Sequence, residues 1–187
     1  LPNTLTYLGD SAFHSCKSIT NIEIPNSLTY IGSGVFKYCS SLNYNINDNL
    51  KYLGNNTNPY LYLVDTTSTS IKTAYIDEKC KFIADYAFSN CTALSSINIP
   101  NKVTVIQDCT FNNCSSLPEI TLPDGITRIG EAAFAECVSL TNIVIPKGVA
   151  NIEYEAFMGC KSLKNITIPK SVTSLDGNIF EIGRAHV

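Results

Sequence analysis

A proline returns at one fixed step along most of this chain of 187 residues, and phenylalanine repeats at the same step. The marks are Pro2, Pro25, Pro100, Pro123, Pro146 and Pro169, with Phe13, Phe36, Phe88, Phe111, Phe134, Phe157 and Phe180. A fixed period of about 20–50 residues is the signature of repeat proteins, whose units are too small to bury their apolar side alone and therefore stack. The period thus predicts a solenoid with one continuous core.

Each repeat divides into three short segments. In the clearest copy, residues 140–145 read Leu-x-x-Ile-x-Ile, and this alternation predicts a short strand. Pro146 ends the strand, because proline lacks the N–H that a strand ladder needs. The Val-x-x-Ile segment at 149–152 predicts a second short strand. An Ala-Phe-x-x-Cys segment, as in residues 131–137, is expected to form one short helical turn in each coil of the repeat.

The repeat is interrupted between Ile24 and Ile99. This segment divides at Ile46 and Ile76 into three units, and the long middle unit lacks the Phe and Cys marks. Within that unit, residues 60–63 alternate at period two, a polar run follows at 65–70, and residues 71–76 are again strand-like. We therefore expect a β-hairpin inserted into the solenoid at residues 55–75, among seven or eight stacked coils.

The combined motif is Leu-x-x-Ile-x-Ile-Pro, then Val-Thr-x-Ile-Gly, then Ala-Phe-x-x-Cys-x-x-Leu. It resembles the BspA-type leucine-rich repeat over about residues 1–180, and six copies carry both Phe and Cys. The resemblance implies a leucine-rich-repeat solenoid built mainly from short parallel β-strands. It also implies a surface or secreted protein of mucosal bacteria or protozoa, in a family where several members are adhesins toward host matrix proteins or other microbes. The chain departs from the family pattern in the inserted unit, at the short step from Ile24 to Ile46, and at Asp77, where proline is expected.

The domain organisation is expected to be simple. Residues 1–181 are interpreted as a single leucine-rich-repeat solenoid fragment, cut at both ends. Residues 182–187, Ile-Gly-Arg-Ala-His-Val, break the pattern and resemble a translated sequencing adapter, so they are left out of the fold prediction.

Composition narrows the function. The net charge is only −3 and the lysines are scattered singly, whereas a nucleic-acid binder usually has a basic face, so no nucleic-acid partner is expected. The apolar runs are far shorter than the roughly 20 residues needed to span a bilayer, so no membrane contact is expected. There are only two histidines, and the one in the repeat, His14, occupies a variable slot typical of a solvent-facing position. We therefore predict no catalytic, cofactor or metal site.

The eight cysteines are interpreted as structural. Six occupy one column of the repeat, namely Cys16, Cys39, Cys91, Cys114, Cys137 and Cys160. The other two, Cys80 and Cys109, take slots that are apolar in other coils. Buried cysteine behaves as a small apolar residue, so packed thiols are expected. Cysteines on neighbouring rungs could also approach disulfide distance, and pairing stays open on the sequence alone.

Tyrosine gives the one candidate binding signal. Six of the ten tyrosines fall between residues 38 and 75. If Leu61 and Leu63 face the core, Tyr60 and Tyr62 share the opposite face, and together with Tyr75 they are the candidate partner-binding residues. Tyrosine is favoured at interfaces because it combines contact area with a polar tip. The competing interpretation is that these rings simply cover the edge of the solenoid.

The sequence as a whole predicts a non-catalytic protein-binding or adhesion scaffold of a cell-surface or secreted protein. The expected partner is a protein, such as a host matrix protein or another microbial surface protein. The alternative is a repeat spacer or targeting region of a larger extracellular enzyme.

Overall fold

The computed structural model describes residues 1–180, so residues 182–187, the predicted adapter segment, lie outside the described part. The described chain forms fourteen strands of two to five residues and has no helix. They are β1 (Tyr7–Leu8), β2 (Tyr30–Ile31), β3 (Asn45–Asn47), β4 (Leu50–Leu53), β5 (Tyr62–Thr66), β6 (Thr73–Tyr75), β7 (Phe82–Ile83), β8 (Ser96–Asn98), β9 (Val105–Ile106), β10 (Glu119–Ile120), β11 (Arg128–Ile129), β12 (Asn142–Ile143), β13 (Asn151–Ile152) and β14 (Ser174–Leu175). No helix in this range is long and apolar enough to cross a membrane.

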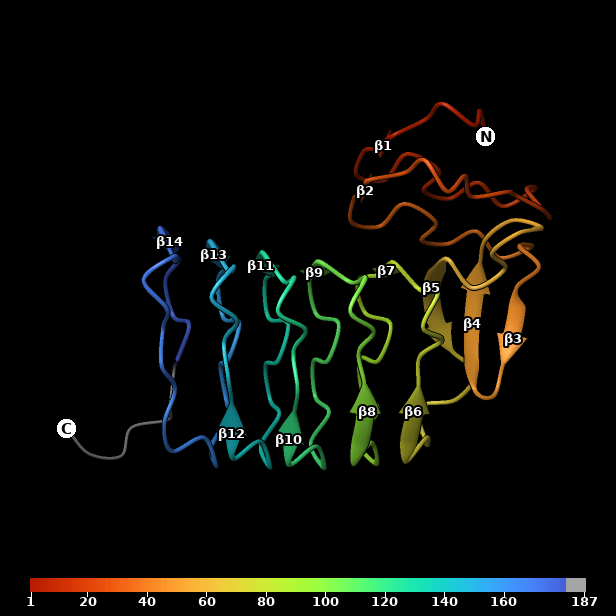
Figure 1. Cartoon of the computed structure of the whole chain (residues 1–187). Helices are drawn as coiled ribbons and strands as arrows, with labels where there is room; N and C mark the ends of the chain where they lie inside the picture. The colour runs from red at the N-terminus through yellow and green to blue at the C-terminus, as the bar shows by residue number, and fades with distance from the viewer. Residues whose placement is uncertain (181–187) are drawn as a thin grey trace.

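The coils stack as a β-solenoid (Figure 1). Strands β6, β8, β10 and β12 follow one edge of the stack, and β7, β9, β11, β13 and β14 follow the other. Neighbouring coils pair in parallel at the repeat step, so that Arg128 lies beside Val105 on one side and Asn151 on the other. The predicted solenoid of stacked repeat coils, with short parallel strands, is thus confirmed.

The predicted helical turn is wrong. In residues 131–137, Ala132 and Glu136 adopt left-handed backbone angles, with φ of 49° and 57°. A right-handed helix cannot pass through such residues. The Phe134 amide donates to the Ala156 carbonyl of the next coil (2.8 Å), whereas the Ala135 amide donates back to Ala132 (3.1 Å). Successive amides therefore donate in turn to a carbonyl of the next coil and to a carbonyl within the same turn. These bonds satisfy the backbone amides without a helix.

The core is a column of aromatic rings beside a column of thiols. Phe111 and Phe134 are fully buried, and their ring centroids lie 5.4 Å apart in a stacked arrangement. The Cys137 thiol donates to the Phe111 carbonyl at 3.1 Å, and the Cys160 thiol donates to the Phe134 carbonyl at the same distance. All eight cysteines are free thiols, six of them buried, and burial raises the pKa of Cys160 to about 12. The cysteine column therefore fills space in the core and donates hydrogen bonds to the backbone carbonyls of the phenylalanine column.

The interrupted unit forms a sheet of its own, in the order β3-β4-β5-β7. Strands β3 and β4 make a tight antiparallel hairpin that turns at Asp48, whose φ is 51°. Strand β5 pairs antiparallel with β4 and parallel with β7, which returns the chain to the solenoid. The hairpin expected within residues 55–75 is wrong in its pairing, because β6 joins β8 in parallel and does not pair with β5. Residues 71–76 have the apolar pattern of a regular coil, with Ile71, Ala74 and Ile76 buried. Strand β6 therefore pairs with β8 of the next coil, as the other coils pair with their neighbours.

The solenoid changes direction at this unit. We name residues 1–44 the N-terminal array and residues 71–180 the C-terminal array. Their coils stack in different directions, with β3, β4 and β5 at the corner between them (Figure 1). Across the corner, the Gln107 side-chain amide donates to the Ile31 carbonyl (2.9 Å) and the Gly34 amide donates to the Asp85 carboxylate (2.9 Å). The second coil of the N-terminal array is thereby held against Asp85 and Gln107 of the C-terminal array.

Candidate binding cleft

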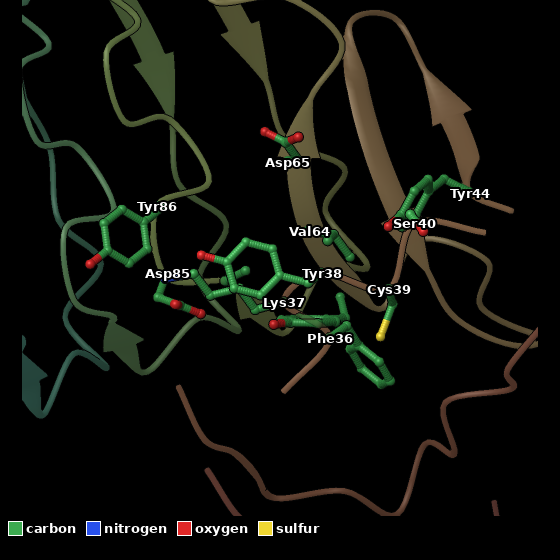
Figure 2. Close-up of a pocket in the computed structure, with 12 residues that line it drawn as sticks. Phe36, Lys37, Tyr38, Cys39, Ser40, Tyr44, Val64, Asp65, Asp85 and Tyr86 are labelled. Carbon is green, nitrogen blue, oxygen red and sulfur yellow. The ribbon is translucent and has the colours of Figure 1, made fainter. Parts of the chain in front are cut away.

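A cleft of about 410 Å³ opens where the two arrays meet (Figure 2). Its lining comes from three segments distant in sequence: the second coil of the N-terminal array, strand β5, and the loop after β7. The lining residues are Phe36, Lys37, Tyr38, Cys39, Ser40, Tyr44, Tyr62, Val64, Asp65, Ala84, Asp85 and Tyr86. The change of direction of the solenoid therefore creates this cleft, since a straight stack would keep these segments apart.

Tyr38 and Tyr86 stand in slots where a tyrosine is unexpected. Both have left-handed backbone angles, with φ of 63° and 60°. A bulky residue there is unusual and costs on the order of 1 kcal/mol. In the other coils, the slot of Tyr38 holds Ser15, Asn90, Asn113, Glu136 or Gly159, and the slot of Tyr86 holds Ser11, Gly34, Cys109, Ala132, Glu155 or Asn178. Tyr38 is 62% exposed and Tyr86 is 48% exposed, so neither ring compensates this strain by deep burial.

The charges around the cleft are nearly balanced. The Lys37 ammonium lies over the Tyr86 ring, 4.5 Å from its centroid, and 5.6 Å from that of Tyr38. Within residues 1–180 no carboxylate lies within ion-pair distance of Lys37. Asp65 pairs with Lys51 at 3.2 Å, and Asp85 accepts the Gly34 amide. The cleft thus presents one cationic donor, Lys37, and two anionic acceptors, Asp65 and Asp85, on aromatic walls.

The Tyr62 hydroxyl is a polar group without a protein partner. Tyr62 is only 2% exposed, and its ring tilts against Phe36 with the centroids 6.0 Å apart. Its hydroxyl makes no hydrogen bond to any described residue, yet no fully buried side-chain oxygen in that range lacks a partner. The hydroxyl therefore keeps some access to solvent, and Asp85 and Tyr44, which act on its pKa, also line the cleft. Burial raises its pKa, followed by the effects of Asp85 and Tyr44, so the hydroxyl stays neutral and can donate or accept.

Tyr86 is also held neutral. The neighbouring Cys109 thiol, which belongs to the next coil, is the main cause that raises the pKa of Tyr86 to about 12. At physiological pH both Tyr62 and Tyr86 therefore carry a hydroxyl proton. The cleft offers neutral phenols and not phenolates.

The three tyrosines predicted from the sequence are not brought together. Tyr60 is half-buried against Tyr52, with the ring centroids 5.3 Å apart. Tyr62 lines the cleft, and Tyr75 is 67% exposed on β6, which belongs to another sheet. Tyr60 and Tyr62 were expected on the face opposite Leu61 and Leu63, but Tyr62 is buried like the two leucines, so that face is not open to a partner at Tyr62. At the start of strand β5, side chains on both faces are buried, as Tyr62 and Leu63 show. Alternation along this strand therefore does not distinguish buried from exposed residues.

Sequence reasoning missed Tyr86 and gave Lys37 no role. A comparison of repeat columns could have found both tyrosines of the cleft rim, since an aromatic residue replaces small or polar residues in their two slots. The clustering of tyrosines between residues 38 and 75 could not include Tyr86, which reaches Tyr38 only across the corner.

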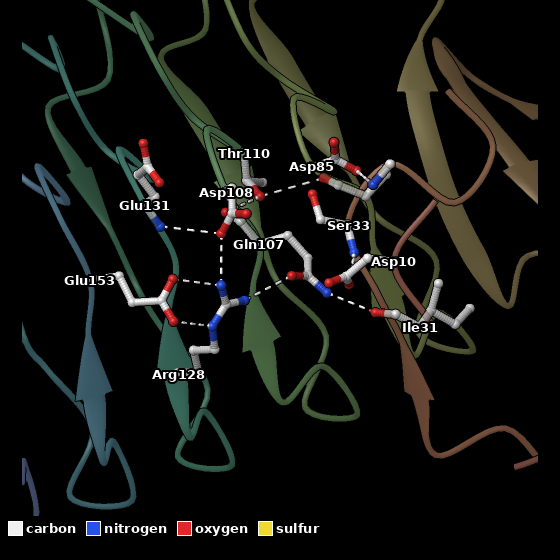
Figure 3. A network of polar contacts seen from close by, with 12 residues as sticks. Asp10, Ile31, Ser33, Asp85, Gln107, Asp108, Thr110, Arg128, Glu131 and Glu153 are labelled. Carbon is white, nitrogen blue, oxygen red and sulfur yellow. Dashed lines mark hydrogen bonds and ion pairs between the residues drawn. The ribbon is translucent and has the colours of Figure 1, made fainter. Parts of the chain in front are cut away.

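A second polar cluster lies beside the corner and is structural (Figure 3). Arg128 donates to Glu153 and Asp108, and also to the Gln107 side-chain oxygen at 2.9 Å. Burial lowers the pKa of Arg128, but Glu153 and Asp108 outweigh burial and raise it overall. Gln107 continues the chain of bonds to Ile31 of the N-terminal array. These groups satisfy one another, and the cluster fixes how the arrays meet.

The described residues contain no group of three or more histidine, cysteine or acidic side chains placed to hold a metal ion. His14 is exposed, and its Nδ1 lies 3.0 Å from the Ser15 hydroxyl. The Cys39 thiol, which lines the cleft, donates to the Phe13 carbonyl at 3.0 Å.

Comparisons with known proteins agree with this architecture. The model of the BspA type leucine rich repeat region matches in six copies over residues 1–59 and 66–183. A leucine rich cell surface protein from Faecalibacterium prausnitzii is 28% identical, with a TM-score of 0.60, over 89% of this chain and 52% of its own. A leucine-rich repeat protein from Bacteroides ovatus is 31% identical, with a TM-score of 0.57, over 96% of this chain and 45% of its own.

The pneumococcal vaccine antigen PcpA shares the fold, with a TM-score of 0.64 at 21% identity, over 95% of this chain and 45% of its own. The chain thus spans about half the length of the solved proteins that it matches. No curated protein matches it.

Proposed function

Because this chain belongs to the BspA type leucine-rich repeat family, we propose that it is a non-catalytic recognition scaffold of a cell-surface or secreted protein. Its partner is a protein, either a host matrix protein or another microbial surface protein, and the role is adhesion. The solved relative described as a cell surface protein supports this placement.

One observation carries the proposal: two exposed tyrosines, Tyr38 and Tyr86, occupy left-handed slots on the rim of one cleft. Smaller residues fill these slots in other coils at a lower conformational cost. Strained residues cluster where a ligand is bound, and tyrosine is enriched among the residues that dominate binding energy. Contact with a partner accounts for keeping the aromatic rings in both slots.

The side chains with chemical reactivity in the cleft support binding over catalysis. The Cys39 thiol is buried and donates to a carbonyl, and Asp85 accepts a backbone amide. Asp65 pairs with Lys51. Each of these three groups is therefore already engaged in a contact within the protein.

The test uses substitutions that the repeat itself provides. Tyr38→Asn and Tyr86→Ala introduce residues that other coils carry in the same slots, at Asn113 and Ala132. We expect the double variant to keep its fold and to bind an immobilised matrix or microbial surface protein at least about tenfold more weakly, as loss of a dominant contact implies. Binding is measured by surface plasmon resonance against a panel of such proteins, with intact wild-type protein as reference.

Tyr75→Ser is the matched control, since Tyr75 is equally exposed but lies on β6, outside the cleft. The control is expected to bind like the wild type. Loss of binding in Tyr75→Ser with retention in the double variant would move the site to the strand face. Absence of wild-type binding across the whole panel would favour the spacer role.

A further inference from the structure

We propose that the corner cleft binds a neutral saccharide carried by the partner protein, with a pyranose ring packed on an exposed tyrosine and its hydroxyl groups bonded to the polar side chains of the cleft. This inference rests on the proposed function, because it names the ligand of the same recognition site. It rests on the size, the unpartnered hydroxyl and the charge pattern of the cleft.

The shape of the cleft suits a sugar. The cleft has a volume of about 410 Å³, within the range of roughly 300–1,000 Å³ that small-molecule sites occupy. Tyr86 and Tyr44 stand at opposite ends of it, and Tyr38 lies between them (Figure 2). The axial C–H groups of a pyranose ring form an apolar face that packs well on such phenol rings. One or two sugar rings fit this space and these walls.

The Tyr62 hydroxyl gives the cleft a hydrogen-bonding group for a ligand. The Tyr62 hydroxyl is unpartnered among described residues, although the residue is only 2% exposed, and it lines the cleft. No fully buried side-chain oxygen among the described residues lacks a partner, so this hydroxyl keeps access to solvent, and a ligand in the cleft can replace water on it. A ligand that both donates and accepts hydrogen bonds satisfies this hydroxyl in either orientation. Sugar hydroxyl groups have this property, whereas an aliphatic guest does not.

The charged side chains of the cleft favour a neutral guest. A basic guest such as an arginine side chain would meet the Lys37 ammonium, which already lies over Tyr86. An acidic guest could pair with Lys37 but would meet Asp65 and Asp85 on the same lining. A neutral polyhydroxylated guest avoids both repulsions. It accepts hydrogen bonds from the ammonium and donates them to the carboxylates.

The experiment titrates the intact chain with lactose, maltose, cellobiose and diacetylchitobiose by saturation-transfer NMR and calorimetry. Two charged probes run in parallel: 3′-sialyllactose, which adds an acid to lactose, and N-acetylarginine amide. We expect at least one neutral disaccharide to bind, and to bind more tightly than either charged probe. Failure of all four neutral sugars, or tighter binding of a charged probe, overturns the inference.

Two variants localise the binding. Tyr62→Phe removes only the hydroxyl and keeps the buried ring, and Tyr38→Asn removes one aromatic wall. Each is expected to weaken the binding of the sugar about tenfold or more, while Tyr75→Ser leaves it unchanged. Unchanged affinity in Tyr62→Phe, with its fold verified by circular dichroism, overturns the inference even if a sugar binds elsewhere.

Failure of this inference is distinguishable from failure of the proposed function. A protein partner identified in the panel is enzymatically deglycosylated and tested again. If binding persists after deglycosylation and still falls in the Tyr38→Asn and Tyr86→Ala double variant, the saccharide inference fails and the recognition scaffold stands. If the double variant binds the untreated partner like the wild type, the proposed site itself fails.

Discussion

Individual side chains in this protein are constrained mainly by their slot in the coil. Cys137 is buried and bonded to a carbonyl because its slot faces the phenylalanine column. Tyr38 is exposed because its slot lies at a left-handed turn on the outer surface. Most positions therefore carry a residue type that suits their place in the coil. Tyr38 and Tyr86 at the rim of the cleft are exceptions, because small or polar residues fill their slots in other coils.

Replacement of Tyr38 by asparagine is expected to stabilise the fold. Asparagine tolerates the left-handed region far better than a bulky aromatic residue does. The loss of the edge contact between Tyr38 and His14, whose centroids lie 5.2 Å apart, offsets part of this gain. We expect the free energy of unfolding in urea to rise by about 0.5–1 kcal/mol. As a control, Tyr7→Asn removes the stacked contact with Tyr30 and should lower it; equal destabilisation in both variants would contradict the strain argument.

The buried thiols predict a loss of stability in alkali. Burial raises the pKa of Cys80 and of Cys160 to about 12, and it also raises the pKa of Cys114 and Cys137. An unfolded thiol titrates near pH 8.5, so above that pH the folded state binds more protons and the free energy of unfolding falls as pH rises. The contribution is fully present below about pH 8.5, and each thiol can remove up to about 2 kcal/mol by pH 10.

Urea unfolding under reducing conditions at pH 7, 8, 9 and 10 measures this loss. Cys137→Ala should reduce the decrease between pH 8 and pH 10 by the share of one thiol, although its stability at pH 7 is lower. A free energy of unfolding that stays constant over this range would refute the assignment of protonated buried thiols.

The elements are held together by contacts between coils more than by contacts within them. Most strands are only two residues long, and the turn around each phenylalanine alternates hydrogen bonds to the next coil with bonds inside the turn. This explains why a helical turn was predicted and is absent. Phe-x-x-Cys spacing places both side chains inward in a helical turn and equally in a turn with i→i−3 bonds, so the apolar pattern does not distinguish them.

The phenylalanine column is expected to dominate the stability of the stack. Phe134 is fully buried, and its ring lies 5.4 Å from those of both Phe111 and Phe157. Phe134→Ala should lower the free energy of unfolding by about 3–5 kcal/mol, the usual result of emptying a packed aromatic site. Phe13→Ala, at a half-buried ring with one stacked neighbour, is the comparison in the same urea measurement and should cost clearly less. Similar losses at both sites would contradict the continuous column.

The whole molecule is a bent solenoid, and the bend carries the candidate site. The cleft exists only while the N-terminal array and residues 82–86 are held together, since its lining comes from both sides. The Gln107 amide is a buried link in that contact, and Arg128 orients it from the C-terminal array (Figure 3). A substitution that loosens the corner should therefore also weaken binding of a partner in the cleft.

Gln107→Ala is expected to loosen the corner without unfolding the C-terminal array. It leaves the Ile31 carbonyl without its donor, a loss of about 1–3 kcal/mol for a buried group. Hydrogen exchange measured by mass spectrometry should become faster in residues 1–44, with little change in residues 110–180, and partner binding should weaken. Thr127→Ala removes a surface bond to the Thr104 carbonyl within the C-terminal array and serves as control; uniform acceleration along the whole chain would show that Gln107 is not specific to the corner.

The sequence by itself determined the period of the coil, the phenylalanine and cysteine columns, and the family. These features repeat, and the contacts behind them join neighbouring coils at a fixed step, so the periodicity records them directly. Only the tertiary structure decided the direction of the stack after β5 and the meeting of Tyr38 with Tyr86 across the corner. The physical reason is that the bend depends on a few contacts between distant segments, such as Gln107 with Ile31 and Asp85 with Gly34. Each of these contacts occurs once, so the repeating pattern of the sequence does not predict them.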